Sequence, residues 1–97
     1  MYRLSNLAAE DFAAIYECTL LHFEVLQADA YTDELDRVLK LLSSSPLMGH
    51  EFPEIADAIR RHDHQNHAIF YRQSEHSIFV IRILHQRMEP WRHLFEI

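Results

Sequence analysis

Residues that can transfer protons or bind phosphate gather in the last forty positions of the chain. Residues 58–97 contain six of the eight histidines and six of the arginines. An imidazole titrates near neutral pH, so it can act as a general acid or a general base. A guanidinium holds phosphate with a planar fork of N–H donors. Together these residue types could cleave a phosphodiester, or they could bind an anionic partner without any chemistry.

RNA cleavage is the first chemistry that these residues could perform. It needs a base for the 2′-hydroxyl, an acid for the leaving oxygen and cations for the phosphate. The histidines of this segment could transfer the protons. Its arginines could clamp the phosphate. A ribonuclease is therefore one hypothesis for the function.

A metal site is the second possibility. His62 and His64 have the spacing that places two imidazoles on one face of a strand, and His67 follows closely. Asp63 would face the other way, and no cysteine pair is available to complete a zinc site. Solvated strand histidines explain the pattern as well, so we expect neither a metal nor a cofactor.

The charge of the chain is divided unevenly between its two parts. The formal net charge is −6, which disfavours unaided binding to nucleic acid. Residues 1–57 hold three basic side chains against eleven acidic ones, whereas residues 58–97 hold six arginines against four acids. An anionic partner should therefore meet the second part of the chain.

Length and composition predict one domain over residues 1–97, with 48% of the residues apolar. The single cysteine, Cys18, agrees with a reducing compartment, and we expect it to be a small buried residue. No apolar run approaches the length of about eighteen residues that a membrane span needs. The first residues also lack a signal-peptide pattern, so we expect a soluble cytoplasmic protein.

Two helices are predicted in the first part of the chain, the first of them capped by Ser5 or Asn6. The apolar stripe of the first helix consists of Ala8, Phe12, Ile15, Thr19 and Phe23. That of the second consists of Ala28, Tyr31, Leu35, Val38, Leu39 and Leu42. Residues 43–46 (Ser-Ser-Ser-Pro) should end the second helix, and a loop should follow to about Asp57.

Four strands are predicted around these helices. They cover residues 2–5, 59–64, 68–72 and 77–84. The last strand is apolar on both faces, with Ile78, Val80 and Leu84 on one and Phe79, Ile81 and Ile83 on the other. It should therefore lie inside the sheet. The order β-α-α-β-β-β predicts an α+β fold in which a helical hairpin packs on a small antiparallel sheet.

Two segments of the second part are similar to a known family: residues 67–72 (His-Ala-Ile-Phe-Tyr-Arg) and residues 82–89 (Arg-Ile-Leu-His-Gln-Arg-Met-Glu). Further matches lie along the first part, at Tyr2–Ser5, Ala8, Asp11, Phe12, Ile15, Gln27, Ala28, Tyr31, Leu35, Leu42, Pro46 and Gly49. On these residues the chain resembles the ParE branch of the RelE/ParE toxins of bacterial type II toxin–antitoxin systems. Glu24 stands where the family commonly has glycine, so the hairpin corner must differ or be strained.

The resemblance implies the same β-α-α-β-β-β fold and a cognate antitoxin, ParD-like or another small DNA-binding protein. It also implies that the target is DNA gyrase, poisoned so that its cleaved-DNA complex persists. The resemblance therefore favours a toxin that inhibits its target by protein contact over one that acts as an enzyme. The RelE branch instead cuts mRNA on the ribosome, so the resemblance keeps a ribonuclease as the alternative. It implies His62 and His85 as the residues that would transfer protons, and Arg82 and Arg87 as those that would clamp the phosphate.

Three sets of contact residues follow from these expectations. The exposed target-binding residues should be Arg60, Arg82, His85, Arg87 and Trp91. The antitoxin should use the rim of a helical stripe that otherwise builds the core: Phe12, Ile15, Thr19, Leu35, Leu39 and Leu42. The apolar face of a short terminal helix, formed by Trp91, Leu94 and Phe95, should either dock on the chain's own sheet or lie exposed for a partner.

Overall fold

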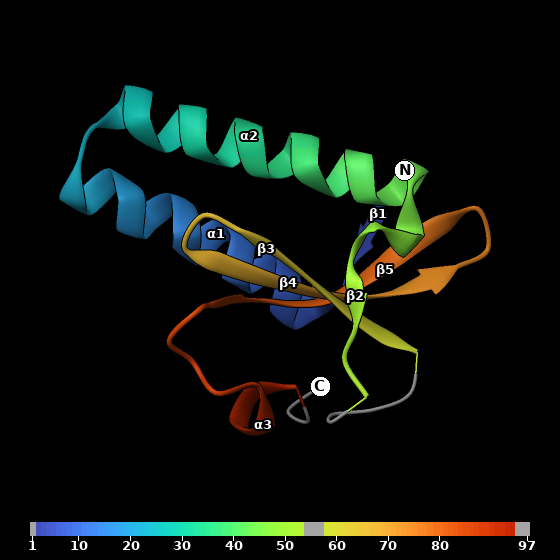
Figure 1. Cartoon of the computed structure of the whole chain (residues 1–97). Helices are drawn as coiled ribbons and strands as arrows, with labels where there is room; N and C mark the ends of the chain where they lie inside the picture. Colours follow the sequence, from blue (N-terminus) through green and yellow to red (C-terminus); the bar gives the residue numbers. More distant parts are fainter. Residues whose placement is uncertain (1, 54–57, 95–97) are drawn as a thin grey trace.

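The computed structural model describes residues 2–53 and 58–94, and it confirms the predicted α+β class (Figure 1). The elements in chain order are β1 (Tyr2–Leu4), α1 (Asn6–His22), α2 (Val25–Ser44), the 3₁₀ helix η1 (Pro46–Met48), β2 (His50–Glu51), β3 (Ile59–His64), β4 (His67–Ser74), β5 (Ser77–His85) and α3 (Pro90–His93). The helix η1 and the strand β2 lie in the segment predicted to be a loop.

The sheet has five strands in the order β1-β5-β4-β3-β2. Strand β5 lies between β1 and β4, as its two apolar faces predict. The pair β1–β5 is parallel and the other pairs are antiparallel, so the sheet is mixed and not wholly antiparallel. Parallel neighbours need a long crossover, and the whole chain between β1 and β5 supplies it.

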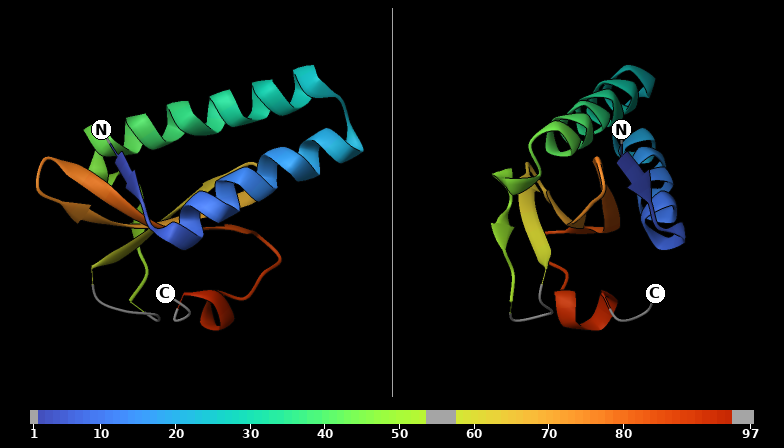
Figure 2. Two further views of the ribbon diagram at one scale, coloured as in Figure 1. Left: turned by 180° about the vertical axis from the view of Figure 1, so that it is seen from behind. Right: turned by 90° about the vertical axis from the view of Figure 1, so that its right-hand side faces the viewer.

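The helices α1 and α2 form a hairpin on one face of the sheet (Figure 2). Helix α1 begins as predicted, because the Ser5 side chain accepts a hydrogen bond of 3.0 Å from the backbone N–H of Ala8. The buried core between hairpin and sheet consists of Ala8, Ile15, Leu35, Leu39, Leu42, Ile69, Tyr71, Ile78, Val80 and Ile83.

The tip of the hairpin projects past the end of the sheet (Figures 1 and 2). Phe23 is 68% exposed there, so its predicted place in the buried stripe is wrong. The sheet that would cover it does not reach so far. Glu24 is extended (φ −147°), so the corner differs from a left-handed turn and is not strained.

Among the described residues no helix is both long and apolar enough to cross a membrane.

The opposite face of the sheet carries a second, smaller core. Its buried residues are Ala68, Phe70, Ile81, Leu84 and Leu94. Leu94 follows α3, so the predicted docking of the terminal segment on the sheet is confirmed for this residue. Phe95 and the side chain of Trp91 lie outside the described residues.

A β-bulge in β5 decides which of its side chains face the helices. Phe70 pairs with Arg82 and Tyr71 with Val80, which leaves Ile81 as an extra residue. The alternation of β5 therefore shifts by one position. Ile83 packs in the helix-side core and Leu84 in the opposite one, the reverse of the prediction.

The single glycine, Gly49, allows a close approach to Tyr71. The Gly49 N–H donates to the Tyr71 hydroxyl (2.9 Å), which in turn donates to the Pro46 carbonyl (2.7 Å). A Cβ at Gly49 would lie 2.4 Å from that hydroxyl oxygen. No side chain can fit at this position without displacing the fully buried Tyr71.

Candidate functional site

Arg82 is held in place by Asp11 of α1. Its Nε lies 2.8 Å from Asp11 Oδ2 and its Nη2 lies 2.9 Å from Oδ1, the geometry of a bidentate ion pair. Its Nη1 donates to the His93 carbonyl (3.0 Å). Asp11 Oδ2 also accepts from the backbone N–H of Ile83 (3.0 Å), where β1 no longer covers the edge of β5. Asp11 therefore joins α1 to the edge of β5.

This arrangement corrects the expectation that Arg82 is an exposed binding residue. Arg82 is only 7% exposed, and its donors are used inside the molecule. It cannot serve as a phosphate clamp while this ion pair holds. The sequence placed Arg82 and Arg87 in one motif, but the bulge and the fold around Asp11 separate their roles.

The exposed part of the predicted motif is the terminal turn, which we define as residues 85–88. His85, Arg87 and Met88 are all exposed in it. The backbone N–H of Met88 donates to the His85 carbonyl (2.9 Å), and that of Arg87 donates to His85 Nδ1 (3.2 Å). These bonds fix the imidazole at the end of β5, so a partner would meet it in a defined orientation.

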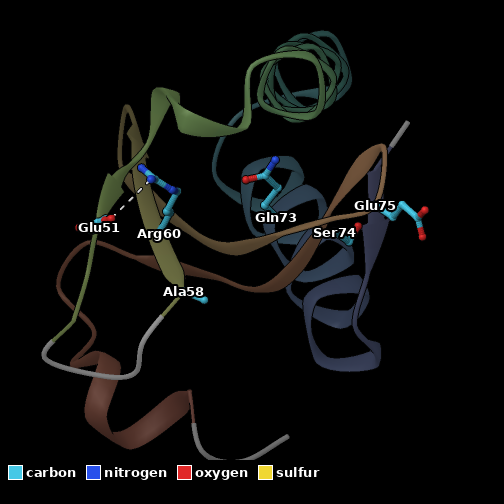
Figure 3. A pocket seen from close by; sticks show the side chains of 6 residues that line it. All are labelled: Glu51, Ala58, Arg60, Gln73, Ser74 and Glu75. Atoms are coloured by element: carbon cyan, nitrogen blue, oxygen red, sulfur yellow. Dashed lines mark ion pairs between the residues drawn. The ribbon is translucent and has the colours of Figure 1, made fainter.

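Arg60, another predicted binding residue, lies two strands away from β5 and towards the other end of the sheet from the terminal turn, since it pairs with Tyr71, which pairs with Val80. Its Nη1 donates to the Gly49 carbonyl (2.6 Å), and its Nη2 lies 3.7 Å from Glu51 (Figure 3). It lines a pocket of about 500 Å³ with residues of β2 and of the β4–β5 hairpin. The structure therefore does not bring Arg60 together with His85 and Arg87.

Three histidines form a row across neighbouring strands on the helix side of the sheet. In cross-strand register His64 of β3 lies opposite His67 of β4, which lies opposite His85 of β5. The rings of His67 and His85 are 5.6 Å apart. The Tyr31 hydroxyl of α2 lies 2.6 Å from His67 Nδ1. Sequence reasoning missed the pairing of His67 with His85, because only the register of β4 and β5 creates it.

The surroundings of His67 keep it uncharged. Burial lowers the pKa of His67, and the nearby His85 and His64 lower it further, while Asp11 acts in the opposite direction. His67 is thus a neutral imidazole that can donate or accept hydrogen bonds near neutral pH. No group of three or more His, Cys, Asp or Glu among the described residues could hold a metal ion.

The predicted catalytic pair is not assembled. His62 lies opposite Ile69, which lies opposite Ile83, so His62 and His85 are two strands apart and out of register. With strands about 4.8 Å apart and about 3.3 Å per residue, their Cα atoms are separated by roughly 12 Å. Without Arg82 as a clamp, the ribonuclease constellation predicted from the sequence does not form.

A groove of about 350 Å³ joins the histidine row to the helical hairpin. It is lined by α1, the start of α2, the β3–β4 turn and the end of β5. Cys18 lines this groove and is exposed, which corrects the expectation of a buried cysteine. Its Sγ lies 3.8 Å from His22 Nδ1, a contact that their spacing of four on a helix could have predicted.

The predicted antitoxin residues divide into core and rim. Leu35, Leu39 and Leu42 are fully buried and Ile15 is 7% exposed, so these four build the core and present little surface to a partner. Phe12 and Thr19 are half-buried, and Thr19 lines the groove beside Ile15. The open surface of the hairpin is therefore this groove and the exposed tip beyond it.

With the fold and this site defined, comparison with known proteins identifies the family. A family model described as the ParE toxin of the type II toxin–antitoxin system, parDE, matches residues 2–90. The chain belongs to the ParE toxin family. It is 35% identical over 94 residues to Toxin ParE1 of Mycobacterium tuberculosis and 32% identical over 93 residues to Toxin ParE1 of Caulobacter vibrioides, with 96% of each chain covered in both comparisons.

A solved structure of the chromosomal ParDE system from P. aeruginosa has the same fold. Its TM-score is 0.74 at 19% sequence identity, and the match covers 87% of this chain and 92% of that one. The resemblance seen in the sequence is thereby confirmed at the level of family and fold. The chain is a ParE-type toxin of a ParDE type II toxin–antitoxin system.

Proposed function

We propose that the chain inhibits DNA gyrase by protein contact in the cytoplasm and that a ParD-like antitoxin neutralises it. The terminal turn carries this proposal. It presents His85 and Arg87 at the end of an interior strand whose preceding residues are locked by the Arg82–Asp11 ion pair. A rigid base with an exposed basic tip loses little conformational freedom on binding, which favours recognition by contact. Arg60 and Trp91 are secondary candidates for the same target.

The antitoxin is proposed to occupy the groove and the hairpin tip. Leu21 (83% exposed), Phe23 and Leu26 (75% exposed) gather at the tip. An exposed apolar surface of this kind suits the apolar face of an amphipathic segment. The acidic helices around it favour a segment with basic side chains on its polar face. Binding of such a segment should raise the melting temperature of the toxin.

The test of the gyrase proposal is a supercoiling assay with purified toxin. The unaltered chain should inhibit supercoiling and raise the amount of cleaved DNA, whereas His85→Gln/Arg87→Gln should lose most of both effects. Arg37→Gln, on the exposed side of α2, is the matched control and should inhibit like the unaltered chain. Gyrase that stays fully active at high toxin excess would overturn the proposal.

A ribonuclease remains the second candidate, because the histidine row places His67 next to His85 and Tyr31. Its signature would be mapped cuts in mRNA in a reconstituted translation assay. His67→Asn/His85→Gln should then abolish the cuts without unfolding the chain. We expect no cuts, since the described part of the chain has no arginine ready to clamp a phosphate beside this row apart from Arg87.

A further inference from the structure

The face of the sheet opposite the helices carries two arginines against one aromatic ring. Arg3 of β1 and Arg72 of β4 flank Phe79 of β5 in cross-strand register. Their guanidinium carbons lie 5.6 Å and 5.2 Å from the centre of the Phe79 ring. We call Arg3 and Arg72 the arginine pair. Both side chains are exposed, and stacking on the half-buried ring restricts their freedom.

The arginine pair has no counter-charge in the described part of the chain. Four other arginines lie within ion-pair distance of a carboxylate: Arg60, Arg61, Arg82 and Arg92. Neither Arg3 nor Arg72 does. Glu75, on the turn that follows β4, instead lies 4.0 Å from His76. Two like charges held against one ring without an anion repel each other, so an anion from outside the chain would relieve an unfavourable arrangement.

The rest of the molecule is charged in the opposite sense. Seven acidic residues lie on α1 and α2, on the other side of the sheet: Glu10, Asp11, Glu17, Asp29, Asp33, Glu34 and Asp36. The net charge of −6 repels free duplex DNA. Phosphates can therefore meet the arginine pair only when a partner that already binds the chain brings them to this face.

We propose that the arginine pair contacts the sugar–phosphate backbone of DNA that gyrase holds. This inference rests on the proposed function, in which the target carries DNA. A planar guanidinium backed by an aromatic ring presents its N–H edge to solvent, which suits the bidentate recognition of a phosphate. In this arrangement the terminal turn makes the main contact with gyrase, and the arginine pair contacts phosphates of the bound DNA. The toxin would then bind gyrase that holds DNA more tightly than gyrase without DNA.

The experiment measures binding of the toxin to gyrase with and without bound duplex DNA, over a series of salt concentrations. With DNA present, Arg3→Gln/Arg72→Gln should bind at least about tenfold more weakly than the unaltered chain, since two charge-assisted contacts are lost. The slope of log affinity against log salt should fall by about 2, close to one unit for each phosphate contact. Without DNA the two proteins should bind gyrase equally.

Two controls separate charge, geometry and folding. Arg37→Gln removes one positive charge from α2, away from the arginine pair, and should leave both affinities unchanged. Arg72→Lys keeps the charge but loses the planar fork, so its affinity for DNA-bound gyrase should lie between those of the unaltered chain and Arg72→Gln. Thermal melting of each variant should match that of the unaltered chain within a few degrees, because the substituted side chains are exposed.

The possible outcomes distinguish this inference from the proposed function. An equal loss of affinity with and without DNA would mean that the arginine pair meets an acidic surface of gyrase itself, which overturns the DNA contact. Unchanged affinity in both conditions also overturns it. Failure of the unaltered chain to bind gyrase at all would overturn the proposed function and this inference with it.

Discussion

The middle of the sheet and its histidine end contain similar residue types but satisfy their polar groups very differently. In the middle, Arg82 and Asp11 pair at 2.8 and 2.9 Å, and the Tyr71 hydroxyl both donates and accepts. At the histidine end, the buried His64 Nε2 has no hydrogen-bond partner among the described residues, and two further imidazoles lie beside it in register. The polar groups in the middle of the sheet stabilise the fold, whereas those at the histidine end can still bind a proton or a partner.

Arg82 and Arg87 show what this difference teaches. They lie five positions apart in one sequence motif, yet one is buried in an ion pair and the other is exposed in the terminal turn. The residue type alone therefore does not separate a structural arginine from a binding one. Burial and hydrogen-bond partners distinguish the two roles. Substitution of Arg82 should therefore lower the stability of the fold, whereas substitution of Arg87 should lower binding to the target.

The largest effect is expected at Arg82. Arg82→Gln leaves the largely buried Asp11 carboxylate without its cation, which should lower the free energy of unfolding by about 3–5 kcal/mol. The melting temperature should fall by more than about 10 °C. Denaturant titration followed by circular dichroism measures the change. Arg87→Gln should alter stability by less than about 0.5 kcal/mol.

A double-mutant cycle sharpens this prediction. Asp11→Asn should destabilise the chain about as much as Arg82→Gln, and the double variant should cost little more than either single one, because both report one interaction. A small effect of Arg82→Gln on stability, combined with a loss of toxicity, would return Arg82 to the binding residues and contradict the buried ion pair.

The next effect concerns Gly49 and Tyr71. Gly49→Ala would bring a methyl group against the Tyr71 ring, so we expect a loss of about 1–3 kcal/mol from overpacking. Tyr71→Phe removes the two hydrogen bonds of the hydroxyl but creates space, and it should lose about 1–2 kcal/mol. In the double variant the clash is smaller, so its loss should be less than the sum. Strict additivity would show that Gly49 does not act through Tyr71.

Local signals allowed much of the fold to be predicted. The Ser5 cap, the end of α2 before Pro46 and the interior position of β5 all depend on residues close in sequence. The parallel pairing of β1 and the short strand β2 could not be predicted in this way. Both depend on contacts between distant segments, and β2 has only two residues, too few for a recognisable pattern.

The candidate site was harder to predict for the same reason. One inserted residue in β5 changed the faces of Ile83 and Leu84 and left Arg82 pointing to Asp11, seventy-one positions away in the chain. The pairing of His67 with His85 likewise follows from register. A pattern of alternating residues does not reveal a bulge. The sequence analysis therefore placed the right residue types in the right segment but assigned Arg82 the wrong role.

A smaller effect is expected at His64, where the histidine end has its least satisfied polar atom. His64→Phe removes the buried Nε2 and keeps a ring beside Tyr31, whose ring centre lies 6.0 Å away. We expect the free energy of unfolding to rise by about 1 kcal/mol, the cost of a buried polar atom without a partner. Destabilisation would instead show that the contact with Glu34, 3.6 Å from this nitrogen, stabilises the folded chain.

The smallest effect is a dependence of stability on pH that arises at His67. Burial and the neighbouring His85 and His64 lower its pKa in the folded chain, while Asp11 opposes them and Tyr31 contacts its Nδ1. The unfolded chain, with a histidine pKa of about 6.5, therefore binds more protons at mildly acidic pH. Stability should be fully present above about pH 7 and should fall as the pH drops through about 6.5 towards the lower folded value. Burial also lowers the pKa of His62, which adds to the same trend.

His67→Asn isolates the contribution of His67, because the amide oxygen can take the place of Nδ1 and accept from Tyr31. Melting temperatures measured between about pH 5.5 and about pH 7.5 should change less in this variant than in the unaltered chain. His76→Asn is the matched control, since the side chain of His76 is 92% exposed on the β4–β5 turn, and it should keep the full dependence. If both variants keep the full dependence, acid acts elsewhere in the molecule, and the histidine end is no more sensitive to protons than the middle of the sheet.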